Sequence, residues 1–231
     1  MLGLHPGERA LVISAHPEDA AFGMGGTIAA LAVRGITVDV LAVTDQTCVM
    51  RGVAVGAEAR QREFGDACDV LGVQGRQIGW TGDGAVGRPA TGLPGLVTLI
   101  TQGPGPSLAV TRPAALFIPT CGHHQDHQAA HRAALAAIRQ WAHGNQPDPR
   151  LVFAYDDPAE GIWISENTAR PAVVDITGTT LVKRQALDCY TQICADPHPR
   201  SLPKIQAMDQ AAGAAVRSEA AERFAVYRIV L

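Results

Sequence analysis

Short apolar runs alternate with helical segments along most of this chain. The runs typical of buried strands are ALVISA (10–15), TVDVLAVTD (37–45), LFIP (116–119), LVFAY (151–155) and PAVVDI (171–176). Apolar residues at helical spacing follow the first three runs, over residues 21–35, 56–73 and 126–142. Strands that alternate with helices predict βαβ units, and so an α/β fold with a mainly parallel sheet covered on both faces. Because no linker divides the sequence, we expect one domain over residues 1–231.

The rest of the chain gives further expectations about helices and loops. Asp126 is predicted to be a helix N-cap, and Gly35 and Gly72 are predicted to end helices. The remaining predicted elements are a helix over 179–193, one or two last helices over 206–227, and loops over the Gly- and Pro-rich residues 79–95 and 194–203.

The composition excludes several classes of protein. The formal net charge is −3 and no run of basic residues occurs, so a nucleic-acid partner is not expected. No apolar run approaches the roughly 20 residues of a membrane span, and the first residues do not form a signal peptide. The five cysteines show no CxxC spacing, which disfavours a disulfide framework and indicates a reducing, cytoplasmic location.

The stretch SAHPEDAAFGMGG places three polar groups where the first strand ends. His16 and Asp19 are three residues apart at the start of a helix, so both side chains can face one point. Imidazole and carboxylate are normal zinc ligands, and Glu18 between them is free to act on a water molecule. The alternative is that the acids cap the helix and favour its positive end. This motif alone does not decide between the two.

The glycines in this stretch do not form a dinucleotide-binding motif. Counted from Gly23, the pattern GxGxxG would need glycine where Ile28 stands. The glycines also come well after the strand end rather than in the first turn. We expect Gly25 and Gly26 to allow close packing of the helix.

A second polar motif, TCGHHQDHQAAH, follows the strand at 116–119. It holds four of the eight histidines within nine residues, together with one acid: His123, His124, Asp126, His127 and His131. The pairs His124/His127 and His127/His131 both have a helical spacing that suits a metal, and spacing alone does not choose between them. Because ligands bind at the carboxyl ends of parallel strands, we expect both motifs at one edge of the sheet.

The two motifs together resemble those of the PIG-L/LmbE-like family of zinc-dependent deacetylases. The usual family motifs are AHPDDE near the N-terminus, followed by a glycine-rich helix start, and later HxDH. Further similar segments are RGITVDVLAVTD, RQREFGDACDVLGV, VDITGTTLVKRQALDCYTQ and AERF, the last of which the resemblance places in a final helix. The resemblance implies a three-layer, Rossmann-like (LmbE-like) fold and hydrolytic removal of an N-acetyl or N-acyl group from an amino-sugar-containing small molecule.

The resemblance also implies a role for each matching residue in the motifs. Zinc would be held by His16, Asp19 and His127. Glu18 would be the general base, in place of the aspartate that is usual there. His124 would stabilise the oxyanion that forms when water attacks the amide carbonyl.

Three more roles, and two departures from the family pattern, follow from the same comparison. Asp126 would orient a histidine, while Arg60 and Asp45 would contact substrate hydroxyl groups. Glu18 adds one methylene to the usual aspartate, which moves the base by about 1 Å, and an error of that size can cost on the order of 100-fold in rate. Ala20 replaces the usual glutamate after the acid pair. These departures favour an unusual substrate or subgroup.

Two other functions stay open on the sequence. One is an amidase that cleaves a larger amide conjugate with the same metal chemistry. The other is a pseudoenzyme that retains zinc and serves as a binding protein. Iron(II) could replace zinc on such ligands, and the sequence leaves open whether the chain forms a homo-oligomer.

Overall fold

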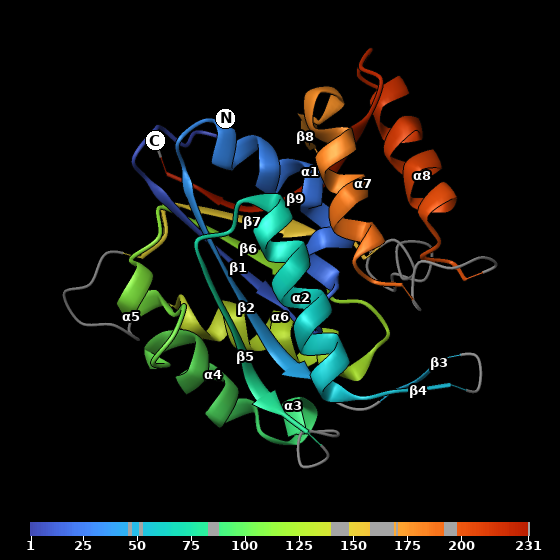
Figure 1. The fold of residues 1–231 in the computed structure, drawn as a ribbon. Coiled ribbons are helices and arrows are strands. Elements are labelled where there is room, and N and C mark those ends of the chain that lie inside the picture. The colour runs from blue at the N-terminus through green and yellow to red at the C-terminus, as the bar shows by residue number, and fades with distance from the viewer. Residues whose placement is uncertain are drawn as a thin grey trace.

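A computed structural model describes residues 1–45, 48–50, 53–82, 88–139, 148–157, 169, 171–191 and 198–230 (Figure 1). Seven strands form one sheet in the order β5-β2-β1-β6-β7-β9-β8, and a separate hairpin pairs β3 with β4. The strands are β1 Arg9–Ser14, β2 Thr37–Asp45, β3 Cys48–Met50, β4 Val53–Val55, β5 Gly75–Thr81, β6 Ala115–Pro119, β7 Leu151–Tyr155, β8 Ala172–Asp175 and β9 Ala221–Ile229. Strands β5, β2, β1, β6 and β7 run parallel, whereas β9 is antiparallel to both of its neighbours. The expected mainly parallel sheet is confirmed.

Helices cover both faces of this sheet (Figure 1). They are α1 Asp19–Val33, α2 Ala57–Leu71, α3 Arg88–Thr91, α4 Leu93–Gln102, α5 Leu108–Thr111, α6 Gln125–Ala137, the 3-10 helix η2 Thr177–Thr179, α7 Thr180–Asp188 and α8 Leu202–Ala214. Side chains alternate along β1, so Ala10 and Val12 pack with α1, α2 and α7, while Leu11 and Ile13 pack with α4 and α6. These two apolar layers, one on each side of the sheet, make the expected three-layer α/β fold.

The prediction of one or two helices over residues 206–227 is correct for the first part of this range and wrong for the second. Helix α8 ends at Ala214, and the chain then enters the sheet as β9, between β7 and β8. The motif AERF therefore lies in a strand, not in a last helix. Alanine, glutamate and arginine favour helices, but pairing with two neighbouring strands overrides this preference.

The predicted loop over 79–95 is also partly wrong. Strand β5 continues to Thr81, and α3 and α4 occupy most of residues 88–95, while 83–87 lie outside the described residues. Pro94 lies in the first turn of α4, where a missing N–H costs nothing, so proline there does not exclude a helix. In the predicted loop 194–203, residues 198–201 contain no helix or strand, but 202–203 already lie in α8, and 194–197 lie outside the described residues.

The sheet brings the two polar motifs together. Strands β1 and β6 are parallel neighbours, with Ala10 opposite Ala115 and Val12 opposite Phe117. Their carboxyl ends therefore meet at one edge, as expected. The acids Asp45 and Asp157 reach the same edge, because β2 and β7 flank this pair of strands.

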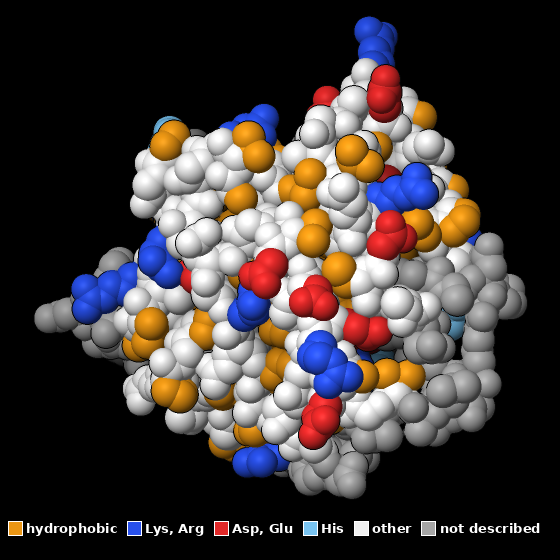
Figure 2. Space-filling model, in the orientation of Figure 1, with side chains coloured by type: hydrophobic (Ala, Val, Ile, Leu, Met, Phe, Trp, Pro, Cys, Tyr) orange, Lys and Arg blue, Asp and Glu red, His pale blue; other side chains and the backbone are white. Residues whose placement is uncertain are grey.

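The surface and the helices add two observations. On the face shown in Figure 2, acidic and basic side chains of the described residues are interspersed over the helices. Among those same residues, we find no helix with both the length and the apolar character needed to cross a membrane.

Candidate active site

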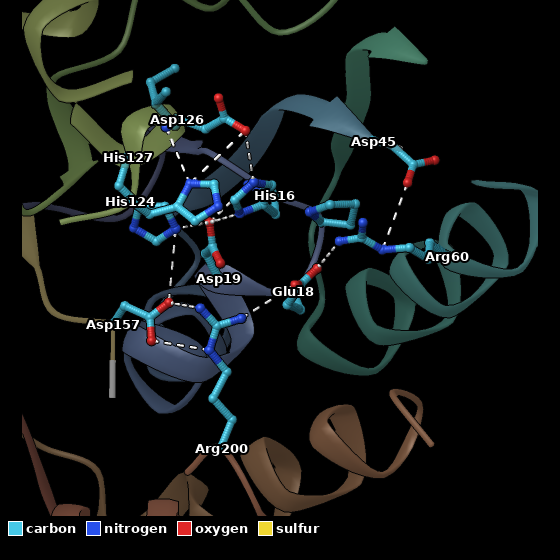
Figure 3. A network of polar contacts seen from close by, with 12 residues as sticks. His16, Glu18, Asp19, Asp45, Arg60, His124, Asp126, His127, Asp157 and Arg200 are labelled. Carbon is cyan, nitrogen blue, oxygen red and sulfur yellow. Dashed lines mark hydrogen bonds and ion pairs between the residues drawn. The ribbon is translucent and has the colours of Figure 1, made fainter. Parts of the chain in front are cut away.

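The centre of the site is a group of two imidazoles and one carboxylate. The ligand atoms of His16, Asp19 and His127 all lie within 4.8 Å of one another, and all three residues are buried (Figure 3). Asp19 Oδ2 lies 3.2 Å from His127 Nε2 and 3.6 Å from His16 Nδ1. Residues from the two separate motifs therefore converge on one point, as the sequence predicted for this edge.

The first motif is shaped by the start of α1. The backbone N–H of His16 donates to Asp19 Oδ2 over 2.8 Å, which fixes the turn between the strand and the helix. Glu18 occupies the N-cap position of α1, but its side chain makes no capping hydrogen bond. Capping alone therefore does not explain why Glu18 stands there.

The second motif is shaped by the start of α6. The N-cap is His124, whose Nδ1 accepts a hydrogen bond from the backbone N–H of Asp126 over 3.2 Å. The prediction of Asp126 as the N-cap is wrong, because Asp126 is already inside the first turn. An imidazole that accepts at Nδ1 carries its proton at Nε2 when it is neutral. Nε2 of His124 can then serve as a hydrogen-bond donor.

Asp126 links the two motifs. Its Oδ2 lies 3.2 Å from His16 Nε2 and 4.0 Å from His124 Nδ1. The contact with His16 leaves Nδ1 of that ring to face Asp19. A carboxylate behind a metal-binding imidazole fixes the ring and its tautomer, and Asp126 is in position to do this for His16.

The carboxylates favour a positive charge at this place. Burial lowers the pKa of His16, but Asp19, Asp126 and Glu18 raise it to about 10. Burial raises the pKa of Asp19, yet His127 and His16 hold it well below its usual range. The pKa of His127 is raised in the same way, because Asp19 outweighs its burial. Protons or a divalent cation can supply the charge that these groups stabilise.

Glu18 lies beside this group and contacts arginine. Its Oε2 accepts a hydrogen bond from Arg60 Nη2 over 2.7 Å, and Arg60 Nε lies 3.7 Å from Asp45 Oδ1 (Figure 3). Burial raises the pKa of Glu18, but Arg60 and other nearby cations lower it overall. Burial raises the pKa of Asp45, with Arg60 opposing it. Arg60 and Asp45 are therefore part of the site, joined to Glu18.

Two residues of the site were not found from the sequence. Asp157 follows β7, and its Oδ2 lies 3.9 Å from His127 Nε2. Arg200 precedes α8 and contacts both Asp157 and Glu18. Asp157 could have been found, because it is an acid directly after a predicted parallel strand. Arg200 lies in a Pro-rich segment that carries no comparable signal.

His131 lies outside the metal-ligand group. Its Nδ1 lies 2.8 Å from the carbonyl oxygen of Pro119, and its Nε2 lies 3.2 Å from the hydroxyl of Tyr227. Both ring nitrogens therefore have partners within the fold. Of the two histidine pairings left open by the spacing, the structure brings His127, and not His131, to His16 and Asp19.

The donor set fits a divalent metal such as zinc. Donor atoms about 2.0–2.1 Å from a tetrahedral zinc lie about 3.3 Å apart, close to the 3.2 and 3.6 Å measured from Asp19 Oδ2. Asp19 Oδ1 is buried and has no hydrogen-bond partner among the described residues. Burial of a carboxylate that is not fully hydrogen-bonded is costly, and a cation beside Asp19 would offset that cost.

The fold and the site define a class: three-layer α/β proteins that carry a His-Asp-His group at the carboxyl edge of a parallel sheet. The family model described as PIG-L, GlcNAc-PI de-N-acetylase, matches residues 11–138, which contain both polar motifs. The chain belongs to the PIG-L family. Deacetylases of this family are metal-dependent, in agreement with the ligand group found here.

Two curated relatives of this chain are named as deacetylases. The chain is 32% identical over 183 residues to the 1D-myo-inositol 2-acetamido-2-deoxy-alpha-D-glucopyranoside deacetylase of Corynebacterium glutamicum, which covers 67% of this chain and 58% of that protein. It is 29% identical over 145 residues to a probable N-acetyl-alpha-D-glucosaminyl L-malate deacetylase 2 of Bacillus cereus, which covers 59% of this chain and 64% of that protein. The chain thus spans less than two thirds of the length of these relatives.

A solved structure has the same fold. The N,N'-diacetylchitobiose deacetylase of Pyrococcus horikoshii has a TM-score of 0.74 at 18% identity, covering 95% of this chain and 84% of that one. At this identity, the similarity supports the LmbE-like fold alone.

Proposed function

We propose that this chain is a metal-dependent N-deacetylase that hydrolyses the amide of a small, N-acylated amino sugar. The observation that carries the proposal is the buried His16, Asp19 and His127 group, with Glu18 and His124 beside it, in a member of the PIG-L family. The names of the curated relatives, both of which are deacetylases of glucosamine-containing molecules, support the same substrate class.

Zinc is the metal we propose, with His16, Asp19 and His127 as its three protein ligands. Two imidazoles and a carboxylate match the donor types of catalytic zinc sites, which leave one position for water. Bound zinc would lower the pKa of water to about 7 and polarise the amide carbonyl.

Glu18 is proposed as the general base. Its lowered pKa keeps the carboxylate ionised at neutral pH, which is the state that accepts a proton. Each carboxylate oxygen has two lone pairs, so contacts with arginine leave room for a water molecule to donate to Glu18. The same carboxyl group then returns the proton to the nitrogen of the leaving amine.

His124 is proposed to donate from Nε2 to the oxyanion, which is the former amide carbonyl oxygen after attack on the amide carbon. The hydrogen bond from Asp126 N to His124 Nδ1 supports this role, because it selects the tautomer with the proton on Nε2. Asp126 is proposed to orient His16. Arg60 and Asp45 are proposed to contact substrate hydroxyl groups.

The proposal includes four broader points. We propose a single domain over residues 1–231 and a cytoplasmic location, the latter supported by Cys68 and Cys189, whose thiols form no disulfide within the described part of the chain. The substrate is a small molecule rather than nucleic acid or membrane. Assembly into a homo-oligomer stays a prediction.

The test is acetate release by the zinc-loaded protein from N-acetylglucosamine glycosides. Release of acetate and a free amine is expected, and the variant His127→Ala, incubated in parallel, should release none. Cleavage of larger amide conjugates without acetate release would favour the amidase alternative. Metal binding without turnover on either kind of amide would favour the binding protein.

A further inference from the structure

A guanidinium group is inserted between two acids of the site. Arg200 Nε donates to Asp157 Oδ1 over 3.2 Å, and Arg200 Nη2 donates to the second oxygen of the same carboxylate. Arg200 Nη1 lies 3.4 Å from Glu18 Oε1 (Figure 3). The guanidinium also lies over the ring of Phe22, 5.6 Å from its centroid. Arg200 is thus held by two charged partners and one aromatic ring.

The carboxylate of Asp157 lies beside the metal-ligand group. Its Oδ2 is 3.9 Å from His127 Nε2, and only 1% of its side chain is exposed. Carboxylates are ordinary zinc ligands, and a fourth protein ligand would close the position that a catalytic site keeps for water. A buried carboxylate so close to the ligands must therefore be restrained if that position is to stay open.

The pair between Arg200 and Asp157 has the geometry for such a restraint. The planar guanidinium offers two parallel N–H groups that match both carboxylate oxygens, and such bidentate pairs are strong and directional. Only 13% of the Arg200 side chain is exposed, so solvent screens the pair weakly. By contrast, one oxygen of the Asp19 carboxylate faces both imidazoles, and the ion pairs of Asp19 among the described residues are with His16 and His127.

We propose that Arg200 is a positioning residue that holds the Asp157 carboxylate out of the metal coordination sphere, and that with Arg60 it fixes Glu18 beside the site. The inference rests on the metal-binding part of the proposed function. Asp157 is then an acid whose position is set by its arginine, while Asp19 is the acid that binds the metal.

The test uses cobalt(II), whose visible spectrum changes when a carboxylate replaces water as a ligand. Arg200→Gln releases Asp157 into the position kept for water, so we expect cobalt(II) to bind about tenfold more tightly or better, with a changed visible spectrum. Asp157→Asn alone should leave both affinity and spectrum unchanged. The double variant Arg200→Gln/Asp157→Asn should restore the wild-type spectrum, because no additional carboxylate is present.

Two controls separate ligation from other effects. Arg200→Lys keeps the positive charge but cannot form the bidentate pair. A spectral change in this variant therefore shows that Asp157 has become free to move, and it cannot result from loss of charge. Arg150→Gln removes a similar pair, with Glu8, which is remote from the site and should leave the cobalt(II) spectrum unchanged. Circular dichroism confirms that each variant is folded.

Affinity and spectrum of the variants together test whether Arg200 restrains Asp157. Tighter binding by Arg200→Gln with an unchanged spectrum, or lost affinity in Asp157→Asn, would overturn it; the latter would make Asp157 a ligand. The readout does not depend on turnover, so a wild-type protein that binds cobalt(II) but releases no acetate would overturn the proposed activity alone. A wild-type protein that binds no cobalt(II) would overturn the metal site itself.

Discussion

At the scale of single residues, Glu18 is the point where this chain departs from the usual motif of its family. Aspartate at this position would be one methylene shorter. The structure shows where the longer side chain reaches: Oε2 meets Arg60 and Oε1 meets Arg200. The departure is therefore accompanied by two arginine contacts that fix the position of the longer carboxylate.

Replacing Glu18 tests its role as the base. Glu18→Gln preserves the size of the side chain but cannot accept a proton, so turnover should fall by about 100- to 10,000-fold while metal stays bound. Steady-state acetate release and metal analysis of the same preparation measure the two quantities. An unchanged rate in Glu18→Gln would contradict the mechanism. Glu18→Asp should also be slower, because the contacts with Arg60 and Arg200 are built around the longer side chain.

His124 gives a second test at this scale. His124→Ala removes the proposed donor to the oxyanion, and loss of one such donor typically costs about 100- to 1,000-fold in rate. The metal should be retained, because His124 is not one of the three proposed ligands. If His124→Ala instead loses the metal, His124 is a ligand, and the alternative group with His16 and Asp126 is the metal site.

Most residues of the site could be predicted because two short motifs carry them. Six of them lie within 16–19 and 124–127, and each motif directly follows a strand that its apolar run reveals. Arg200 could not be predicted, since its approach to Glu18 depends on how a segment 182 residues further along folds back over the sheet edge. The residues around Arg200 do not indicate this long-range contact.

At the scale of elements, helix α1 is kinked at Met24 and packs closely through its glycines. Met24 has φ −148° and ψ 23°, outside the helical range. A Cβ atom on Gly26 would lie 2.8 Å from the Cβ of Ile176, and one on Gly25 would lie 3.2 Å from Lys183 Cγ. The expected close packing is therefore present, against α7 and the end of β8.

Substitution at Gly26 should disturb this packing. Gly26→Ala forces Ile176 to move, and overpacking of this kind costs about 1–3 kcal/mol, partly offset by the better helix propensity of alanine. We expect a lower free energy of unfolding by about 1–2 kcal/mol, measured by urea denaturation. Gly178→Ala is the matched control, because its Cβ would meet no atom within 4 Å. Equal stability of the two variants would contradict the packing argument.

The elements that sequence patterns predicted well are those with consistent local signals. Strands β1, β2, β6 and β7 are buried apolar runs. The centre of a parallel sheet covered on both faces buries such runs and pairs their backbone groups. The residues of β9 were predicted to lie in a helix, because alanine, glutamate and arginine favour helices. Its place between β7 and β8 is decided by contacts with strands far away in sequence.

At the scale of the whole molecule, a buried ionic network joins the two ends of the chain. Glu222 on β9 accepts hydrogen bonds from the backbone N–H groups of Gly26 and Thr27, at 3.0 and 2.7 Å. Lys183 Nζ on α7 lies 2.7 Å from Glu222 and 2.8 Å from Asp209. Burial lowers the pKa of Lys183, but the two acids raise it overall. The network fixes the kinked helix that starts at the candidate active site.

Breaking this network should destabilise the fold. Glu222→Gln leaves Lys183 buried with one fewer countercharge, and loss of a partner in a buried pair costs about 3–5 kcal/mol. We expect about 3 kcal/mol, since Asp209 still pairs with Lys183, and urea denaturation measures it. Asp69→Asn breaks an exposed pair with Arg76 and should leave the unfolding midpoint unchanged. A similar midpoint shift in both variants would argue against a structural role for the buried network.

We propose that residues following the neighbouring strands β1 and β6, at one edge of the parallel sheet, form one metal site. The direct measurement is the metal content per chain of purified wild-type, His127→Ala and His131→Ala proteins, by mass spectrometry of the dissolved metal. We predict one divalent metal per chain in the wild type and in His131→Ala, and little in His127→Ala. Full metal occupancy in His127→Ala, or its loss in His131→Ala alone, would contradict the assignment.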